Sequence, residues 1–308
     1  MSLLLIAPKK DMHILKEALL DVDQHLDIEI WPNVKHKERV TFAVSWQHPE
    51  GIFEGYPNLQ AIMSYGAGVD HMVKDKTLPD VSFSRVVAPS LSEQLADYVL
   101  AAVLNYQQHI IEYSSKRTAS TWSPKNPRLK SNIYIGVMGL GHIGGTVATR
   151  LAQNGYRVNG WAASQKELDG ISTFYGTKQL REFVQKSNVL VCLLPLTPET
   201  EGILDLDVIK NLRRPSYLIN VARGAHLIEE DLIYALDLDL LQGATLDVFS
   251  EEPLPESHPF WNRPRIMITP HVAAITNPWD VAPQIVENYK RSLSGMELLN
   301  SVDISKGY

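Results

Sequence analysis

The length, composition and charge of the chain exclude several classes of protein. At 308 residues, with 44% hydrophobic and 21% charged residues, the chain suits a globular protein of about two domains. Its net charge of −6 at pH 7 gives no basic surface for nucleic acid or an anionic membrane, and no apolar run approaches the ~18 residues of a membrane span. We therefore expect no nucleic-acid partner and no membrane partner.

The cysteine content and the first residues indicate the cellular compartment in which the protein is expected. The single cysteine, Cys192, excludes an internal disulfide, and its apolar neighbours indicate a buried, inert thiol. In the first residues the lysines follow the apolar run instead of preceding it, which is not the order of a signal peptide. We expect a cytoplasmic protein.

The first ninety residues alternate short apolar runs with helical patterns, which is typical of a parallel sheet with crossover helices. Strands are expected at 3–7, 28–31, 42–46 and 59–65. Ligands of such sheets bind beyond the carboxyl ends of the strands. Trp46 ends one of these runs, and Gly66, Ala67 and Gly68 follow another, where their N–H groups can form an anion site. Plainer roles, a core aromatic for Trp46 and a tight turn for the glycines, stay open.

A long helical pattern follows, with one broad apolar stripe over 91–117. A helix of this length suits a domain-linking spine or a dimer contact. The polar, proline-bearing segment 118–132 then predicts a loop.

The stretch 133–153 predicts a strand, a tight glycine turn and a helix. Gly139 permits the turn, Gly141 lets a pyrophosphate approach the backbone, and Gly144 lets the helix pack close to the strand. The first helical turn, with His142 and Ile143, offers unpaired N–H groups to the phosphates. These residues predict a dinucleotide-binding site.

The residues after the next strand, 156–161, bear on the choice of cofactor. NAD-selective folds carry a carboxylate about 20 residues after the fingerprint, and this sequence has Ala162 there. Ser164 and Lys166 can bind a 2′-phosphate, although Lys166 also fits a solvated loop charge. We expect NADP to be preferred, with NAD as the alternative.

The remaining predicted strands, at 189–194, 217–221, 244–248 and 266–269, end in polar or small residues. Since carboxyl ends of parallel strands share one crevice, these residues can meet around a cofactor. Cofactor contacts are predicted at Leu194 and Pro195, in a stiff loop over the nicotinamide ribose, and at Val221 and Ala222. A terminal helix is expected over 277–293.

Three residues of this crevice carry the chemistry. Arg223 can bind a carboxylate through two parallel N–H groups. His271 can give and take a proton near neutral pH, and a carboxylate such as Glu252 would orient the ring and favour its protonated form. Next to a nicotinamide, this set suits reduction of a 2-keto acid. No metal is expected.

Several motifs resemble those of the D-isomer-specific 2-hydroxyacid dehydrogenase family, and within it the glyoxylate/hydroxypyruvate reductase A subgroup. They are YGAGVD (65–70), GLGHIG (139–144), LLPLTPET (193–200), INVARG (219–224), LDVFSEEPLP (246–255), TPHVAAIT (269–276) and the ending VDISKGY. The resemblance covers nearly the whole chain. One departure is the segment AASQK, where the subgroup carries arginines for the NADP phosphate.

The resemblance implies roles for single residues. Arg223 would hold the substrate carboxylate and 2-oxygen, and His271, backed by Glu252, would be the acid in reduction. Backbone N–H groups around Ala67 and Gly68, with Gly66, would bind the carboxylate. Trp46 would line the substrate pocket, and Asp247 would touch the nicotinamide carboxamide.

The resemblance also implies an α/β architecture of two Rossmann-like, parallel-sheet domains that close on the substrate. The substrate-binding, flavodoxin-like domain would be 1–96 plus 282–308, and the dinucleotide-binding domain 97–281. We expect a homodimer that reduces glyoxylate to glycolate and hydroxypyruvate to D-glycerate. Alternatives are a family member using NADH on phosphoglycerate or a pyruvate-type acid, and a nicotinamide-binding regulator without turnover.

Overall fold

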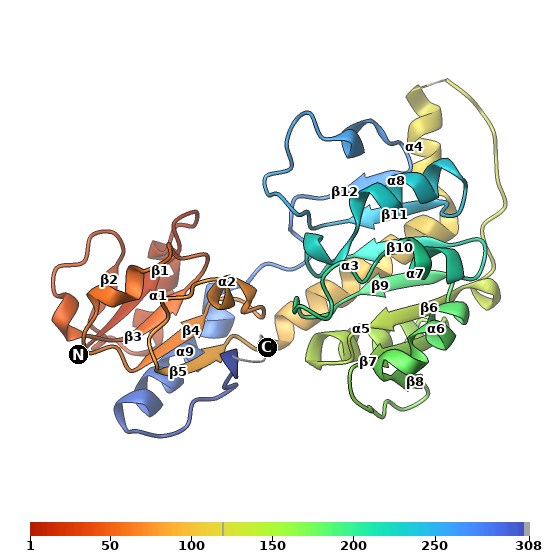
Figure 1. Ribbon diagram of the computed structural model, residues 1–308. Helices are drawn as coiled ribbons and strands as arrows, with labels where there is room; N and C mark the ends of the chain where they lie inside the picture. Colours follow the sequence, from red (N-terminus) through yellow and green to blue (C-terminus); the bar gives the residue numbers. More distant parts are fainter. Residues whose placement is uncertain (119, 305–308) are drawn as a thin grey trace. The chain divides into compact units, whose positions relative to one another are not determined.

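The computed structural model describes residues 1–118 and 120–304, which divide into two compact units (Figure 1). Unit 1 contains Met1–Ser90 and the chain from Thr276 onward, and unit 2 contains Leu91–Ile275. The chain thus crosses from one unit to the other at 90/91 and again at 275/276. The sequence predicts these two crossings at 96/97 and 281/282, each six residues later in the chain. The first crossing lies earlier because helix α3 (Pro89–Gln108) buries its apolar face in the core of unit 2, against strand residues of its sheet.

Unit 1 is built on a parallel sheet in the order β2-β1-β3-β4-β5. This is the order of flavodoxin-like sheets, and it changes direction between β1 and β3. The mostly polar fifth strand was not predicted from the sequence. The strands are β1 (Ser2–Ile6), β2 (Ile28–Ile30), β3 (Val40–Ser45), β4 (Ala61–Ser64) and β5 (Ser82–Arg85).

The C-terminal part of the chain completes unit 1. In Figure 1 the blue helix α9 (Pro278–Leu293) lies among the red and orange elements, where it packs against α1 (His13–Val22). The Asn288 side chain accepts from the N–H of Leu299 at 2.7 Å, and the N–H of Val302 donates to Phe83 in β5 at 2.9 Å. These bonds fasten the chain beyond α9 to the sheet. The short helix α2 (Asp70–Val73) follows β4.

Unit 2 is built on a parallel sheet in the order β12-β11-β10-β9-β6-β7-β8, which changes direction between β6 and β9. The central strands read as continuous apolar runs because helices cover both faces. Together the two sheets confirm the predicted α/β class. The strands are β6 (Tyr134–Met138), β7 (Arg157–Ala162), β8 (Ser172–Tyr175), β9 (Val189–Cys192), β10 (Tyr217–Asn220), β11 (Gly243–Leu246) and β12 (Ile266–Ile268). The remaining helices are α4 (Ile110–Thr118), α5 (His142–Gln153), α6 (Gly176–Gln185), α7 (Leu206–Asn211) and α8 (Glu229–Asp237).

The predicted helix over 91–117 is in fact two helices, so this prediction was wrong. The break is at His109, whose φ is +59°, between α3 and α4. The His109 ring bonds to Glu112 at 2.7 Å and to the Asn126 carbonyl at 3.2 Å, which holds the following loop against the break. The apolar stripe continues across the break, so periodicity does not reveal it.

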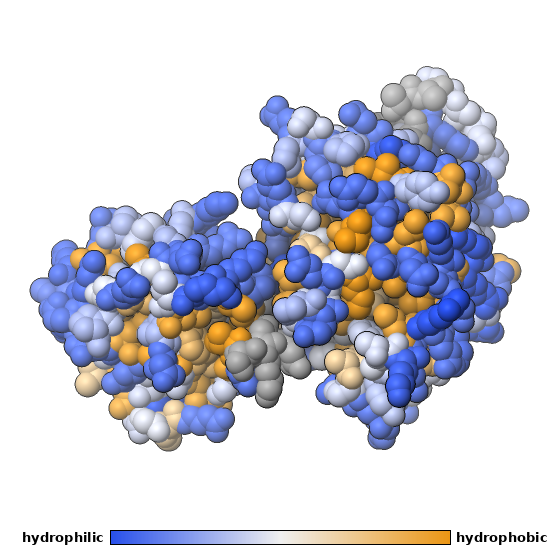
Figure 2. Space-filling model, viewed as in Figure 1, coloured by the Kyte–Doolittle hydropathy of each residue, from blue (hydrophilic) through white to orange (hydrophobic). Residues whose placement is uncertain are grey.

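No helix among the described residues combines the length and the apolar character needed to cross a bilayer. On the face shown in Figure 2, hydrophobic areas are bordered by hydrophilic residues. Cys192 is fully buried, and this burial raises the pKa of its thiol to about 12, in line with an inert side chain.

Candidate active site

His271 and Glu252 form a hydrogen-bonded pair in unit 2. Nδ1 of His271 lies 2.8 Å from Oε2 of Glu252, and Oε1 of Glu252 accepts from the N–H of Phe249 at 3.0 Å. Both side chains are about one third exposed. Within residues 1–118 and 120–304 no protein atom is bonded to Nε2 of His271, so this nitrogen is available to a ligand.

The surroundings of Glu252 keep it ionised. Partial burial opposes the charge, but hydrogen bonds from His271 and from the Phe249 N–H, together with the positive charges of His271 and Arg223, lower its pKa below the usual range. A carboxylate bonded at Nδ1 fixes the orientation of the ring. The pair is therefore suited to donating a proton from Nε2.

The loop that carries His271 wraps around the buried carboxylate of Asp247. Oδ1 accepts from Thr269 Oγ1 at 2.5 Å and from the Val272 N–H at 2.9 Å, and Oδ2 accepts from the Ala273 N–H at 2.9 Å. The N–H of His271 donates to the Asp247 carbonyl at 2.8 Å. The resemblance places Asp247 at the nicotinamide carboxamide, whereas the bonds seen here hold the His271 loop.

Arg223 follows strand β10, next to the loop that leads to Glu252. Asn220, the last residue of β10, donates from Nδ2 to the Arg223 carbonyl at 2.9 Å. Gly224 is needed because a Cβ there would lie 1.9 Å from the backbone carbon of Phe249. This close approach brings the guanidinium near enough to lower the pKa of Glu252. Since β10, β11 and β12 are neighbours, the three predicted catalytic residues follow adjacent strands.

The fully buried His226 joins two loops of the site and was missed by sequence reasoning. Its Nδ1 lies 3.2 Å from the Arg223 N–H, and its Nε2 lies 3.2 Å from the Pro195 carbonyl. The neutral tautomer with its proton on Nε2 satisfies both partners. A histidine three positions after Arg223 carries no sequence signal for this role, which depends on where the Pro195 loop lies.

The glycine loop between β6 and α5 has the form that a diphosphate requires. Gly139 has φ +98°, and a Cβ on Gly144 would lie 1.8 Å from the Gly139 carbonyl oxygen. A Cβ on Gly141 would meet nothing within 4 Å, and Gly141 begins α5 without a side-chain cap. Open space beside uncapped N–H groups fits the phosphates of a dinucleotide. His142 is exposed and Ile143 half-buried in the first helical turn.

The other predicted cofactor residues lie at the carboxyl ends of β7, β9 and β10. At the end of β7, Ala162 is buried, while Ser164 and Lys166 are exposed in the following loop. No acidic residue stands at 162–166 to repel a 2′-phosphate. The side chains of Leu194, Val221 and Ala222 are buried, and that of Pro195 is exposed.

In unit 1, Trp46 packs directly on Gly66. A Cβ on Gly66 would lie 2.3 Å from Cζ3 of the Trp46 ring, so this position has to be glycine. The ring centroid of Trp46 lies 4.7 Å from that of His71. Trp46 is half-buried at the carboxyl end of β3, so one part of it can still meet a ligand.

Side chains fix the carbonyl groups of the glycine turn after β4. Ser64 Oγ donates to the Gly68 carbonyl at 2.8 Å and accepts from the Gly66 N–H at 3.3 Å. Arg85 Nη1 donates to the Ala67 carbonyl at 3.3 Å. In the described part of the chain no acceptor is bonded to the N–H of Ala67 or Gly68. Two free donors at a strand end are suited to an anion.

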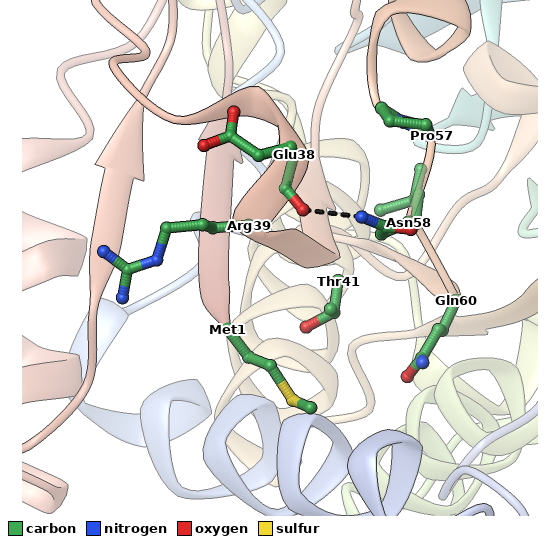
Figure 3. Close-up of a pocket in the computed structure, with 8 residues that line it drawn as sticks. Met1, Glu38, Arg39, Thr41, Pro57, Asn58 and Gln60 are labelled. Atoms are coloured by element: carbon green, nitrogen blue, oxygen red, sulfur yellow. Dashed lines mark hydrogen bonds between the residues drawn. The ribbon is translucent and has the colours of Figure 1, made fainter.

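A hollow in unit 1 lies at the opposite edge of the sheet, where β1, β3 and β4 begin (Figure 3). Met1, Thr41 and Gln60 line it, and Asn58 Nδ2 donates to the Glu38 carbonyl at 2.7 Å. Since ligands of parallel sheets bind at the carboxyl ends, this hollow is not the candidate site. Among residues 1–118 and 120–304, no group of three His, Cys, Asp or Glu side chains is placed to hold a metal ion.

Residues 100–273 match the family model described as the NAD binding domain of D-isomer specific 2-hydroxyacid dehydrogenases. The chain belongs to this family. It is similar to the glyoxylate/hydroxypyruvate reductase A of Yersinia enterocolitica, with 39% identity over 87% of each chain. The protein is therefore an NAD(P)-dependent oxidoreductase, as the motifs predict.

Two solved structures of dehydrogenases resemble the structure of this chain over its whole length. A family member from Xanthobacter autotrophicus, in complex with NADPH and MES, has a TM-score of 0.95 and 38% identity, covering 100% of this chain and 99% of its own. The NADPH-dependent glyoxylate/hydroxypyruvate reductase of Sinorhizobium meliloti, in complex with NADP and sulfate, has a TM-score of 0.92 and 30% identity, covering 100% of both chains. These likenesses confirm the two Rossmann-like units.

Proposed function

We propose that this dehydrogenase reduces small 2-keto acids, glyoxylate to glycolate and hydroxypyruvate to D-glycerate. The observation that carries the proposal is the pair of His271 and Glu252 next to Arg223, on the ends of neighbouring strands of a dinucleotide-binding sheet. The similarity to reductases that are named for these two substrates supports it.

In this proposal the residues of unit 2 have separate tasks. The Arg223 guanidinium binds the substrate carboxylate and the oxygen on C2, where negative charge grows during reduction. His271 gives its Nε2 proton to that oxygen, while Glu252 holds the ring through Nδ1. The bound nicotinamide cofactor supplies the hydride. Asp247 and His226 keep the loops in position.

For unit 1 we propose that the N–H groups of Ala67 and Gly68 bind the substrate carboxylate, with Gly66 and Trp46 beside them. The free donors and the bonds that fix the carbonyl groups of this turn support the assignment. Trp46 would limit the size of the group on C2, because its ring is held on Gly66 and cannot move inward.

We propose NADP as the preferred cofactor and NAD as the weaker one. The glycine loop of residues 139–144 would hold the diphosphate, and Ser164 and Lys166 would meet the 2′-phosphate beside Ala162. The absence of an acidic residue at 162–166 supports this preference, as do similar proteins in complex with NADP or NADPH.

Initial rates of the purified protein test the proposal. NADPH and NADH are each combined with glyoxylate, hydroxypyruvate and pyruvate, and kcat/KM is compared. We expect the highest values with NADPH and one of the first two acids. Preference for pyruvate with NADH would indicate a different dehydrogenase of the family. Cofactor binding without turnover of any acid would indicate a regulator.

We also propose a cytoplasmic homodimer whose contact includes α3, α4 and the loop after them. Exposed apolar side chains on these segments support a contact, namely Leu104, Ile110, Tyr113 and Trp122, of which Trp122 is 96% exposed. A dimer with one such face on each subunit would be two-fold symmetric. The proposed cytoplasmic location rests on the single cysteine, which is fully buried.

A further inference from the structure

Lys10 lies at the point where the sheet of unit 1 changes direction. It follows β1, in a turn closed by its N–H donating to the Ala7 carbonyl at 3.0 Å, and Trp46 follows the neighbouring β3. The Lys10 ammonium is 5.3 Å from the Trp46 ring centroid and 5.7 Å from that of Tyr65. In open α/β sheets, ligands bind at this switch point.

The surroundings of the ammonium leave it without a counter-ion. No ion pair in the described part of the chain includes Lys10, and the rings beside it replace part of its water. Partial burial lowers the pKa of Lys10 below its usual range. The residue as a whole stays exposed, so a ligand from solvent can reach it. A partly desolvated ammonium with no carboxylate partner attracts an anion.

The two rings that Lys10 contacts also border the turn proposed to bind the substrate carboxylate. Tyr65 precedes Gly66 in the chain, and Trp46 packs on Gly66. Lys10 therefore contacts two rings that adjoin the turn carrying the Ala67 and Gly68 donors. A substrate whose first carboxylate is on these donors would have its remaining atoms near the aromatic rings and the ammonium.

We propose that Lys10 binds a second anionic group of the substrate and extends the activity to 2-keto dicarboxylates, of which oxaloacetate is the probe. The inference rests on the proposed function. The chemistry is unchanged: the cofactor gives a hydride to C2 and is oxidised, His271 gives a proton to the C2 oxygen, and the ketone becomes a hydroxyl group. No bond to the second carboxylate forms or breaks.

The test compares oxaloacetate with 2-oxobutyrate, which has four carbons and no second charge. Lys10→Met removes the charge and keeps the length, and Lys10→Arg keeps the charge. We expect Lys10→Met to lower the ratio of the two kcat/KM values by about 10-fold or more, the size of one charge-assisted contact. Lys10→Arg should retain most of the ratio. Lys9→Met, in the same turn, is the matched control and should leave it unchanged.

A binding measurement separates recognition from turnover. With NADPH present, which cannot react with a 2-hydroxy acid, calorimetric titration of D-malate into the protein should show a Kd that rises about 10-fold in Lys10→Met, while the Kd for D-2-hydroxybutyrate changes far less. An equal loss for both acids would assign Lys10 a structural role and overturn the inference, as would an unchanged oxaloacetate ratio.

The same assays separate this inference from the proposed function. If the unmodified protein reduces glyoxylate but not oxaloacetate, the role of Lys10 is wrong and the proposed function stands. If it turns over none of glyoxylate, hydroxypyruvate and oxaloacetate with either cofactor, the proposed function itself fails.

Discussion

Neighbouring residues hold His271 at its side chain and also at the backbone around it. Glu252 binds Nδ1, and the Asp247 carboxylate accepts two N–H groups of the residues that follow His271. His271 itself has φ +55°, a left-handed conformation that costs free energy outside glycine and persists only where neighbours hold it. These contacts hold the loop that carries the ring.

Replacing His271 by Gln should remove the proton donor and keep a side chain of similar polarity. We expect kcat for glyoxylate reduction to fall at least about 100-fold, the usual size of acid–base assistance, with NADPH affinity little changed. Stopped-flow and steady-state rates measure this. A variant with near-normal turnover would show that the proton comes from another group.

Replacing Glu252 by Gln should change how the stability of the protein depends on pH. Because the pKa of Glu252 is lowered, the stability that its charge adds is present above the usual range of a glutamate and is lost as pH falls through its folded-state pKa. In the variant this pH-dependent part of the stability is absent, so we expect the melting temperature to change less between acid and neutral pH. Thermal melts at a series of pH values measure this. An unchanged pH dependence of the melting temperature would show that the charge of Glu252 does not add stability.

Replacing Ala162 by Asp should shift cofactor preference towards NADH. A carboxylate at the end of β7 would repel the 2′-phosphate and accept the ribose hydroxyl groups of NADH. We expect the ratio of kcat/KM for NADPH to that for NADH to fall by about 10-fold or more. The control is Ser172→Asp, at the exposed start of β8 and away from the carboxyl ends of the strands. An unchanged ratio in the first variant would place the phosphate elsewhere.

At the scale of elements, close backbone approaches position the site. Gly144 lies against the turn that starts at Gly139, and Gly224 lies against Phe249. Each approach excludes a Cβ: the first sets α5 against the turn at Gly139, and the second sets the segment after Arg223 against the loop after β11. The glycines of the cofactor loop thus have different tasks, since the space beside Gly141 is open.

This difference predicts opposite outcomes for two similar substitutions. Gly141→Ala should fold normally, because nothing lies within 4 Å of the new Cβ, and should weaken NADPH binding by about 10-fold or more. Gly144→Ala should lower the melting temperature by several degrees, because its Cβ would lie 1.8 Å from the Gly139 oxygen. Thermal melts and cofactor titrations of both variants decide this. Equal melting temperatures would contradict the assignment.

Periodicity predicted most elements but not where they break. The helix predicted over 91–117 divides at His109, whose ring is held by Glu112 of α4 and by the Asn126 carbonyl of the following loop. Helix α7 begins after Asp205, whose side chain accepts from the Val208 N–H. Strands β5 and β8 were missed because edge strands carry few apolar residues.

At the scale of the whole molecule, we predict that the protein is a homodimer. We expect light scattering to give twice the chain mass of 34.6 kDa. Trp122→Ser should weaken the dimer, since burial of a side chain that is 96% exposed contributes only on association. Trp261→Ser, at a half-exposed tryptophan elsewhere in unit 2, is the control. A monomer at all concentrations would contradict the proposal.

The α/β class, the glycine fingerprint and the grouping of Arg223, Glu252 and His271 could be predicted without coordinates, because strand, turn and helix patterns are local and the carboxyl ends of parallel strands share an edge. The partners of Asp247 and His226, and the position of Lys10 over two aromatic rings, could not. Those contacts join loops that are distant in the chain. Their partners depend on strand order, and no local pattern encodes strand order.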